Sequence, residues 1–256
     1  MNSNFTIITP SLNSGDKIQK CIDSVKSQKG VSINHIIVDG GSKDKTVEIL
    51  KSNNSNYKVL RGSSIYEALN HGYKNSRSDL VGFLNCDDFY QSDYSLKTIY
   101  SAYKDNKSYD IFYGNCNFVD NKNNILYKLK SPKTHSFSLQ KKRLFSISHP
   151  CWFIKHDKFK INGKYDTSFK YVSDCDFIIR ALKNNMSFFY VNTFVTNFLL
   201  HENNASKSAS AKDESIRLLS KYNSNKFMSI FLHKALLILL YLKDINYFFY
   251  KFRIKN

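Results

Sequence analysis

Short β-rich runs alternate with amphipathic helical patterns in the first third of the chain, and this order restricts the possible folds more than any other feature. FTIIT (5–9), HIIVD (35–39) and LVGFLN (80–85) are typical of strands. Between the first two, apolar residues from Ile18 to Val25 recur at helical spacing, and two more helical patterns precede the third. We therefore predict an α/β fold with a mixed, mainly parallel sheet flanked by helices.

Polar side chains stand where these runs end. Asn13 follows the first run, Asp39 closes the second, and Asp87 with Asp88 follows the third. Ligands of open parallel sheets bind beyond the carboxyl ends of the strands. We therefore expect these side chains to converge on one crevice.

The adjacent Asp87 and Asp88 have two interpretations. Neighbouring carboxylates disfavour joint ionisation, but a hard cation reverses this preference. Mg²⁺ or Mn²⁺ binds one or two protein carboxylates together with phosphate oxygens. The alternative is that the pair begins a loop or caps a helix near Ser92, and for an isolated pair this is the more frequent case. Asp39 likewise either closes a strand-to-helix turn or bonds the base or ribose of a nucleotide.

Later candidates stand beside other predicted elements. Asp174 and Asp176 open an amphipathic helix over 173–185. A carboxylate there acts as an N-cap or, when it is aimed into the crevice, as a base. His149 and His201 flank strand-like runs. A lone histidine is more often a structural residue than a metal ligand. Either histidine therefore becomes a stronger candidate ligand only if a metal site lies beside it.

The second half of the chain is less regular. A hairpin is expected across 121–124, with strands over 149–155 and in SFFYVNTFVTNFLLH, residues 187–201. Lys and Arg within 131–145 form either a solvated face or a basic loop over a diphosphate. Residues 203–215 are small and polar, which predicts a linker or a mobile segment.

These patterns divide the chain into a domain over 1–202, with halves 1–115 and 116–202, and a segment over 203–256. That segment ends in a tail predicted to be helical, in which Phe, Leu, Ile and Tyr alternate with Lys and Arg over 227–252. Such a tail can lie in a membrane interface without crossing it. The alternative is that it packs on the domain or makes a homodimer contact.

Composition narrows the function classes. Lys and Arg number 38 against 21 Asp and Glu, and the net charge of +17 favours anionic partners. The basic residues are dispersed and form no known motif, so we expect no nucleic-acid partner. Five scattered cysteines without CxxC argue against a zinc site and for a reducing compartment. We see no signal-peptide pattern, and the longest apolar run (235–242) is far shorter than the roughly 20 residues of a spanning helix.

Together these motifs resemble the family 2 glycosyltransferases, which have the Rossmann-like, nucleotide-binding GT-A fold. The resemblance covers most of residues 5–185, in TIITPSLNSGDKIQKCIDSVKSQ, HIIVDGGSKDKT, SSIYEALNHGYKNSRSDLVGFLNCDDFY, HPCWFIK and YDTSFKYVSDCDFIIRAL. It implies an inverting enzyme that moves a sugar from a nucleotide diphosphate sugar, expected to be a UDP-sugar, to a hydroxyl of a saccharide acceptor.

The resemblance also implies roles for particular residues. The catalytic base would be Asp174. The ligands of Mn²⁺ or Mg²⁺ would be Asp87, Asp88 and His201. The acceptor side would include His149, Trp152 and Asp176. The nucleotide-sugar site would be lined by Thr9, Pro10, Asn13, Asp39, Ser64, Asn70 and Asp87.

The chain departs from the family pattern at two motifs. Many relatives have a further acid in the acidic motif where this chain has Asn85 or Cys86. Ser64 and Glu67 replace the usual Gly and Asp around IYEALNHG. These departures leave open a catalytically inactive GT-A-like scaffold that binds a sugar nucleotide or a partner. A nucleotidyltransferase is disfavoured because its Gly-rich, basic N-terminal loop is missing.

The family and the cationic tail together imply a cellular setting. We expect a lipid-linked acceptor, with undecaprenyl diphosphate as the carrier, in the assembly of a bacterial O-antigen, capsule or exopolysaccharide. The enzyme would then be cytoplasmic and peripheral on the inner face of the cytoplasmic membrane.

Overall fold

The computed structural model describes residues 3–135, 137, 147–201, 204 and 208–223. Its strands are β1 (Ser3–Ser11), β2 (Ile33–Asp39), β3 (Asn56–Val59), β4 (Ser78–Phe83), β5 (Phe89–Tyr90), β6 (Ile111–Val119), β7 (Ile125–Leu129), β8 (Trp152–Lys155) and β9 (Phe188–Leu199). Its helices are α1 (Ile18–Lys26), α2 (Thr46–Ser52), α3 (Ile65–Lys74), α4 (Ser95–Asp105), the 3₁₀ turn η1 (His149–Cys151), α6 (His156–Asn162), α7 (Ser173–Lys183) and α8 (Ala209–Tyr222).

The strands of this described part form one sheet in the order β3-β2-β1-β4-β8-β6-β9-β5, with β7 paired to β6. β1 to β4 are all parallel. β8 runs antiparallel to both β4 and β6, whereas β9 is parallel to β6. The predicted α/β sheet is confirmed, and its parallel part is the half built from the first third of the chain.

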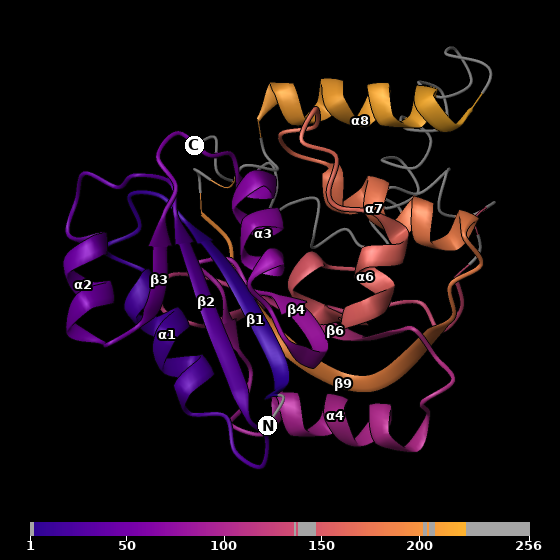
Figure 1. The fold of residues 1–256 in the computed structure, drawn as a ribbon, viewed down its shortest axis with the longest axis horizontal. Coiled ribbons are helices and arrows are strands. Elements are labelled where there is room, and N and C mark those ends of the chain that lie inside the picture. Colours follow the sequence, from indigo (N-terminus) through magenta and orange to yellow (C-terminus); the bar gives the residue numbers. More distant parts are fainter. Residues whose placement is uncertain (1–2, 136, 138–146, 202–203, 205–207, 224–256) are drawn as a thin grey trace.

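Side chains that alternate along the strands form two apolar layers, one on each face of the sheet. On β1, Ile8 packs with buried residues of α3, α6 and α7, among them Leu69, Phe159 and Phe177. Its neighbour Ile7 points to the other face, where the buried residues of α1 and α4 lie. Figure 1 shows the sheet between these two sets of helices. Both faces are therefore covered, as a parallel sheet requires.

The register brings the carboxyl ends of the first strands to one edge. Ser11 on β1 is paired with Asp39 on β2, which is paired in turn with Val59 on β3. The arrowheads of β2 and β3 point to this same edge in Figure 1. The loops that leave these strands therefore begin side by side, where the sequence predicts a crevice.

Several local predictions hold and others need correction. The hairpin is confirmed as β6 and β7, closed by the backbone pair between Asp120 and Asn124. The strand predicted over 149–155 begins only at Trp152, because η1 precedes it with Pro150 in its first turn. Helix α6 follows that strand directly and was not predicted.

The linker predicted over 203–215 is wrong from Ala209 onward. Helix α8 begins there, capped by Ser208, and buries Leu218 and Leu219 against residues of α7 and the loop before it. The predicted division at 115/116 falls inside β6, so its two halves share one continuous sheet. The basic, aromatic tail over 227–252 lies outside the described residues.

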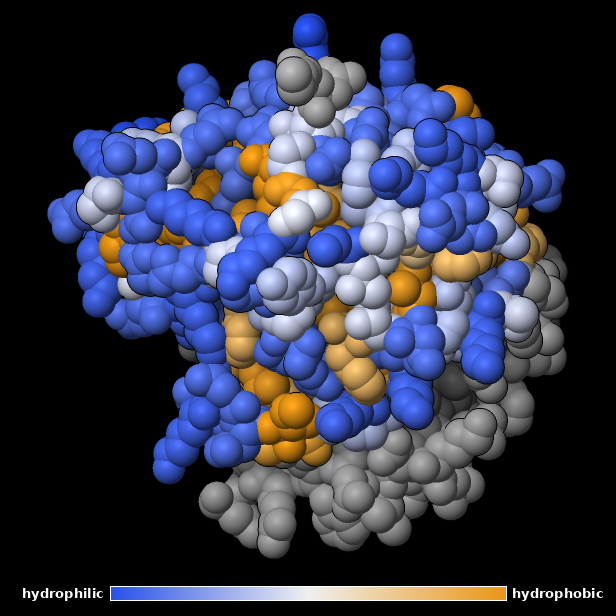
Figure 2. Space-filling model, turned by 90° about the horizontal axis from the view of Figure 1, so that it is seen from below, coloured by the Kyte–Doolittle hydropathy of each residue, from blue (hydrophilic) through white to orange (hydrophobic). Residues whose placement is uncertain are grey.

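No helix within the described residues is both long enough and apolar enough to span a membrane. The face of the molecule in Figure 2 is mostly hydrophilic, and its apolar side chains form separate small patches.

Candidate active site

The carboxylate of Asp39 holds the loop that follows β2. One oxygen accepts hydrogen bonds from the backbone N–H groups of Gly41 and Ser42, at 2.9 and 2.7 Å. The other accepts from the hydroxyls of Ser42 and Ser11, at 2.6 and 2.9 Å. Asp39 is fully buried. Both oxygens are thus used to shape the turn, and the predicted contact with a nucleotide stays a prediction.

Asp87 lies beside His201, as the metal-site prediction requires. His201 Nε2 is 2.7 Å from Asp87 Oδ2, and the two side chains are 13% and 20% exposed. The ammonium of Lys17, at the start of α1, is 3.3 Å from the same nitrogen. Nε2 can donate to Asp87 or accept from Lys17, but it cannot do both at once. Three parts of the chain that are distant in sequence therefore meet at one ring nitrogen.

Asp88 has different surroundings from its neighbour. It is 1% exposed, and its oxygens accept hydrogen bonds from the backbone N–H of Leu199 at 3.0 Å and from Asn85 Nδ2 at 2.8 Å. Burial, with a smaller contribution from the charge of Asp87, raises the pKa of Asp88 well above its usual range. The structure thus places Asp88 behind the Asp87–His201 pair, where it ties the acidic loop to the end of β9.

The side chains at this edge supply only some of the ligands that a divalent cation needs. Asp87 and His201 present one oxygen and one nitrogen, and Nδ1 of His201 is buried without a hydrogen-bond partner among the described residues. Burial raises the pKa of Cys86 to about 12, with a smaller contribution from the charge of Asp87. No cluster of three or more His, Cys, Asp or Glu that could hold a metal occurs in the described part of the chain. Mg²⁺ commonly takes one or two protein ligands and fills its shell with phosphate oxygens and water.

Asp174 stands in the first turn of α7, next to an aromatic cluster. Its Oδ1 accepts a hydrogen bond of 2.8 Å from the hydroxyl of Tyr66 on α3, and its side chain is only partly buried. Burial and the charge of Asp174 raise the pKa of Tyr66 well above its usual range, so the phenol stays a proton donor. No side chain caps α7, so the predicted N-cap role is wrong and the carboxylate is not used for capping.

A chain of contacts links Asp174 to the end of β4. Tyr66 packs on Tyr165 with ring centroids 5.2 Å apart, and the Tyr165 hydroxyl is 2.8 Å from Nε2 of His149. His149 in turn stacks on Phe83, the last residue of β4, at 5.3 Å. Burial lowers the pKa of His149, although the charge of Asp174 opposes this effect. The acidic loop leaves β4 just after Phe83, so this chain of contacts connects Asp174 and His149 to the strand that precedes Asp87.

Asp176 is turned away from that edge. It is fully buried, and it pairs with Arg180 Nε at 2.7 Å and with Lys221 Nζ at 2.9 Å. The hydroxyl of Tyr222 donates a third hydrogen bond of 2.8 Å. Asp176 thus joins α7 to α8, and this arrangement leaves neither oxygen turned toward an acceptor.

Several other predicted residues have structural contacts of their own. Thr9 is buried, and its hydroxyl lies 2.9 Å from Nε2 of His35, while Pro10 is also buried. Asn13 is exposed at positive φ, and its side-chain oxygen accepts the backbone N–H of Lys43.

On α3, Ser64 forms a capping box with Glu67. Asn70 exchanges two hydrogen bonds with the backbone of Tyr165, both 2.9 Å. Trp152 is 1% exposed and stacks on Phe177 in the core, so its predicted place beside the acceptor finds no support in the geometry.

Sequence reasoning missed three side chains of this edge, namely Lys17, Tyr66 and Tyr165. Tyr66 and Tyr165 lie within stretches that carry the family resemblance, but their apolar spacing indicates only core packing. Composition does not single out Lys17, because the chain has 38 basic residues. The available signal for its role was its position at the start of the first helix, two residues after Gly15.

The order of strands and helices defines an α/β protein of GT-A type. The family model described as "Glycosyl transferase family 2" matches residues 6–162. The chain belongs to this family.

Two curated relatives illustrate the similarity. An uncharacterized glycosyltransferase of Rickettsia typhi is 31% identical over 192 residues, which is 72% of this chain and 60% of the relative. A PGL/p-HBAD biosynthesis glycosyltransferase of Mycobacterium bovis is 26% identical over 70% of both chains. The chain thus spans about 60% of the length of the first of these relatives.

Solved structures share the fold at low sequence identity. S. aureus TarS 1–349 in complex with UDP-GlcNAc superimposes with a TM-score of 0.67 at 20% identity, covering 87% of this chain and 66% of that one. The mannosyltransferase PcManGT from Pyrobaculum calidifontis, in complex with GDP-Man and Mn²⁺, gives 0.64 at 12% identity, covering 91% and 69%. Because these sequence identities are low, the similarity to the two solved structures shows a shared fold and nothing more specific.

Proposed function

We propose that this chain transfers a sugar, with inversion, from a nucleoside diphosphate sugar to a hydroxyl of a saccharide acceptor. A UDP-sugar is the preferred donor, because relatives of the same fold bind nucleotide sugars and one of them is complexed with UDP-GlcNAc. The observation that supports the proposal is the Asp87–His201 contact at the end of β4, together with a partly buried carboxylate, Asp174, that accepts a hydrogen bond from Tyr66 and is not used for helix capping.

Asp174 takes the proton of the acceptor hydroxyl as its oxygen attacks the anomeric carbon. A base must lie within hydrogen-bond reach of the proton that it removes. The Tyr66 hydroxyl, which donates to Oδ1 of Asp174, keeps the carboxylate oriented and leaves Oδ2 for the acceptor proton. Attack from the face opposite the leaving diphosphate then inverts the anomeric centre.

The departing diphosphate needs positive charge at the other side of the crevice. Asp87 and His201 are the residues that would hold Mn²⁺ or Mg²⁺, which when bound would act as a Lewis acid on the diphosphate. Lys17 lies 3.3 Å from His201 and supplies a positive charge from the protein itself. An ammonium near a phosphate forms a charge-assisted hydrogen bond, and such bonds are among the stronger ones in proteins. Charge that develops on the leaving group is therefore stabilised from the start of α1.

The acceptor is proposed to be a lipid-linked saccharide of bacterial surface polysaccharide assembly, used at the inner face of the cytoplasmic membrane. The support is the family, the net charge of +17 and the basic, aromatic composition of 227–252. A flotation assay with anionic liposomes tests this part. The full chain should float, and a form ending at Asn225 should not.

The direct test is a panel of UDP-, GDP- and TDP-sugars incubated with the full chain and Mn²⁺, with the released sugar followed by NMR. Slow hydrolysis of a UDP-sugar that yields the inverted anomer supports the proposal. Retention of configuration overturns the mechanism. Tight binding of a sugar nucleotide with no turnover toward water or any saccharide would favour an inactive scaffold instead.

A further inference from the structure

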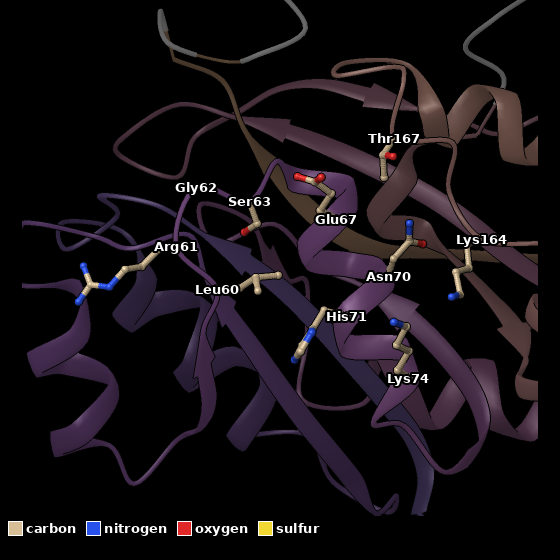
Figure 3. Close-up of a pocket in the computed structure, with 10 residues that line it drawn as sticks. All are labelled: Leu60, Arg61, Gly62, Ser63, Glu67, Asn70, His71, Lys74, Lys164 and Thr167. Atoms are coloured by element: carbon tan, nitrogen blue, oxygen red, sulfur yellow. The ribbon is translucent and has the colours of Figure 1, made fainter.

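A cavity lies beside α3, and neither Asp87 nor His201 lines it. It has a volume of about 450 Å³, within the range of roughly 300–1,000 Å³ that is usual for small-ligand sites. Its wall is formed by the loop after β3, the solvent face of α3 and the loop after α6, as Figure 3 shows. The lining residues are Leu60, Arg61, Gly62, Ser63, Glu67, Asn70, His71, Lys74, Lys164 and Thr167.

The wall carries an excess of positive charge that the protein does not neutralise. Arg61, Lys74 and Lys164 are exposed cations, and His71 lies between them on α3. None of these four side chains forms an ion pair with a carboxylate among the described residues. A concave site lined by charge of one sign raises the local concentration of counter-ions.

The carboxylate of the cavity, Glu67, offsets only part of this charge, because Arg61, Lys74 and Lys164 outnumber it. Its Oε2 accepts hydrogen bonds from the backbone N–H and the hydroxyl of Ser64, at 2.7 and 2.9 Å, as part of the capping box of α3. Figure 3 shows Glu67 at the end of the cavity near Thr167, whereas Lys74 and Lys164 reach toward the opposite end from facing walls. The hydroxyl of Ser63, also on the wall, is buried without a partner among the described residues.

The cavity is joined to the proposed catalytic edge through Tyr165 and α3. Asn70 lines the cavity and holds the backbone of Tyr165 by two hydrogen bonds. The ring of Tyr165 lies on the other side, against Tyr66, which bonds Asp174. Tyr66 and Glu67 are consecutive residues of α3, so neighbouring positions of one helix contact Asp174 and line the cavity.

We propose that this cavity binds a phosphate or diphosphate group carried by the acceptor, held mainly by Lys74, Lys164 and His71. This assignment rests on the proposed function, because only a transferase has an acceptor to position here. Flexible ammonium groups suit a phosphate as point charges. Leu60 is the one large apolar residue among the ten that line the cavity, which argues against an uncharged lipid chain. The acceptor hydroxyl then reaches Asp174 while the phosphate stays on the outer side of α3.

Calorimetric titration of inorganic pyrophosphate into the full chain tests the site. UDP is present at saturation and metal is omitted, so that the donor site is occupied and pyrophosphate is not chelated. We expect saturable binding that weakens as salt is raised. The double variant K74Q/K164Q should lose at least about tenfold in affinity for pyrophosphate, because each charge-assisted contact is removed. The matched control K51Q/K104Q removes exposed lysines from the last turns of α2 and α4 and should stay within twofold.

The remaining outcomes decide the proposal. Equal affinity in the wild type, K74Q/K164Q and K51Q/K104Q overturns it, because binding would then follow net charge alone. An absence of saturable pyrophosphate binding, with attachment to phosphatidylglycerol but not phosphatidylcholine vesicles, also overturns it in favour of a membrane headgroup. UDP affinity should be the same in all three proteins, which shows that they are folded. If pyrophosphate binds as expected while no donor is hydrolysed, the site stands and the proposed function fails.

Discussion

Two regions of the molecule, the loop after β4 and the start of α7, each present a pair of aspartates, and in each pair the two acids have opposite environments. Asp87 is 20% exposed and meets His201, whereas Asp88 is 1% exposed and bonds a backbone N–H. Asp174 is partly buried and accepts from a tyrosine, whereas Asp176 is fully buried in an ion-pair network. In each pair one acid stays partly exposed, and the other is buried and bonded to the surrounding scaffold.

The comparison shows why the structural and functional interpretations of an acidic pair are not exclusive. Successive residues of a loop, or residues two apart on a helix, point in different directions. A buried carboxylate must have its oxygens satisfied, as those of Asp88 and Asp176 are. A catalytic carboxylate must instead stay within reach of a substrate. The four predictions below test whether one acid of each pair serves the ligand and the other the scaffold. They run from the largest expected effect to the smallest.

Asp174→Asn should lower turnover by about 10²–10⁴-fold, which is the usual contribution of a positioned general base. The affinity for UDP should be unchanged, because the diphosphate is held on other elements. Steady-state kinetics with the best donor and calorimetry with UDP measure the two quantities. Normal turnover in this variant would remove Asp174 from the mechanism.

Asp176→Asn, the matched substitution two residues away, should mainly reduce stability. It leaves Arg180 and Lys221 without their shared carboxylate, at a cost of roughly 3 kcal/mol, at the lower end for a buried pair because the Lys221 side chain is 41% exposed. The melting temperature should fall by about 6–12 °C, since the chain is large. Turnover per folded molecule should stay within about threefold, and a loss as large as that of Asp174→Asn would contradict the division.

Asp87→Asn and Asp88→Asn should differ in donor binding. In the presence of Mn²⁺, Asp87→Asn should weaken UDP binding by about tenfold, because it removes one charged ligand of the diphosphate site. Asp88→Asn should change it by less than about threefold and cost about 1 kcal/mol of stability. Calorimetry with and without Mn²⁺ separates the two variants. Equal losses would show that both acids serve the ligand.

His35 extends the comparison to a partly buried base on β2, next to Ile7 of β1. Burial lowers its pKa to about 4 from 6.5, while Thr9 lies 2.9 Å away. Above pH 6.5 the ring is neutral in both states and contributes nothing. As the pH falls toward 4, only the unfolded chain gains the proton, so the free energy of unfolding drops by at most about 3 kcal/mol. His35→Gln should remove this slope in urea unfolding series between pH 7.5 and 4.5, and an unaltered slope would assign it to other groups.

The sequence was sufficient to predict the parallel half of the sheet, because strands and helices there follow regular periods. The sequence also predicted that Asn13, Asp39, Asp87 and Asp88 follow strand ends at one edge, because the carboxyl ends of parallel strands meet. The role of Asp174, at a helix start, came only from the family resemblance. Sequence reasoning missed α6, since HDKFKIN is too short for helical periodicity to stand out. It predicted a linker in place of α8 because small polar residues do not reveal the tertiary contacts of Leu218 and Leu219.

The roles of single carboxylates were harder to predict than their location. Nothing in DCD indicates that Asp176 is bound by Lys221, which lies 45 residues further along the chain. Likewise, the contact of Lys17 with His201 joins residues 184 apart, and only the folded chain reveals it. The position of a residue at the end of a strand predicts the edge of the sheet at which it lies. The direction of its side chain and its long-range partners decide whether its carboxylate is free to contact a ligand.

The most direct test of the central claim, that Asp87 and Asp174 serve one substrate, is a crystal structure of the full chain with a UDP-sugar and Mn²⁺. The account predicts the diphosphate against Asp87, His201 and Lys17, with the anomeric carbon turned toward the carboxylate of Asp174. A nucleotide bound away from Asp87, or a sugar whose anomeric carbon faces away from Asp174, would contradict it.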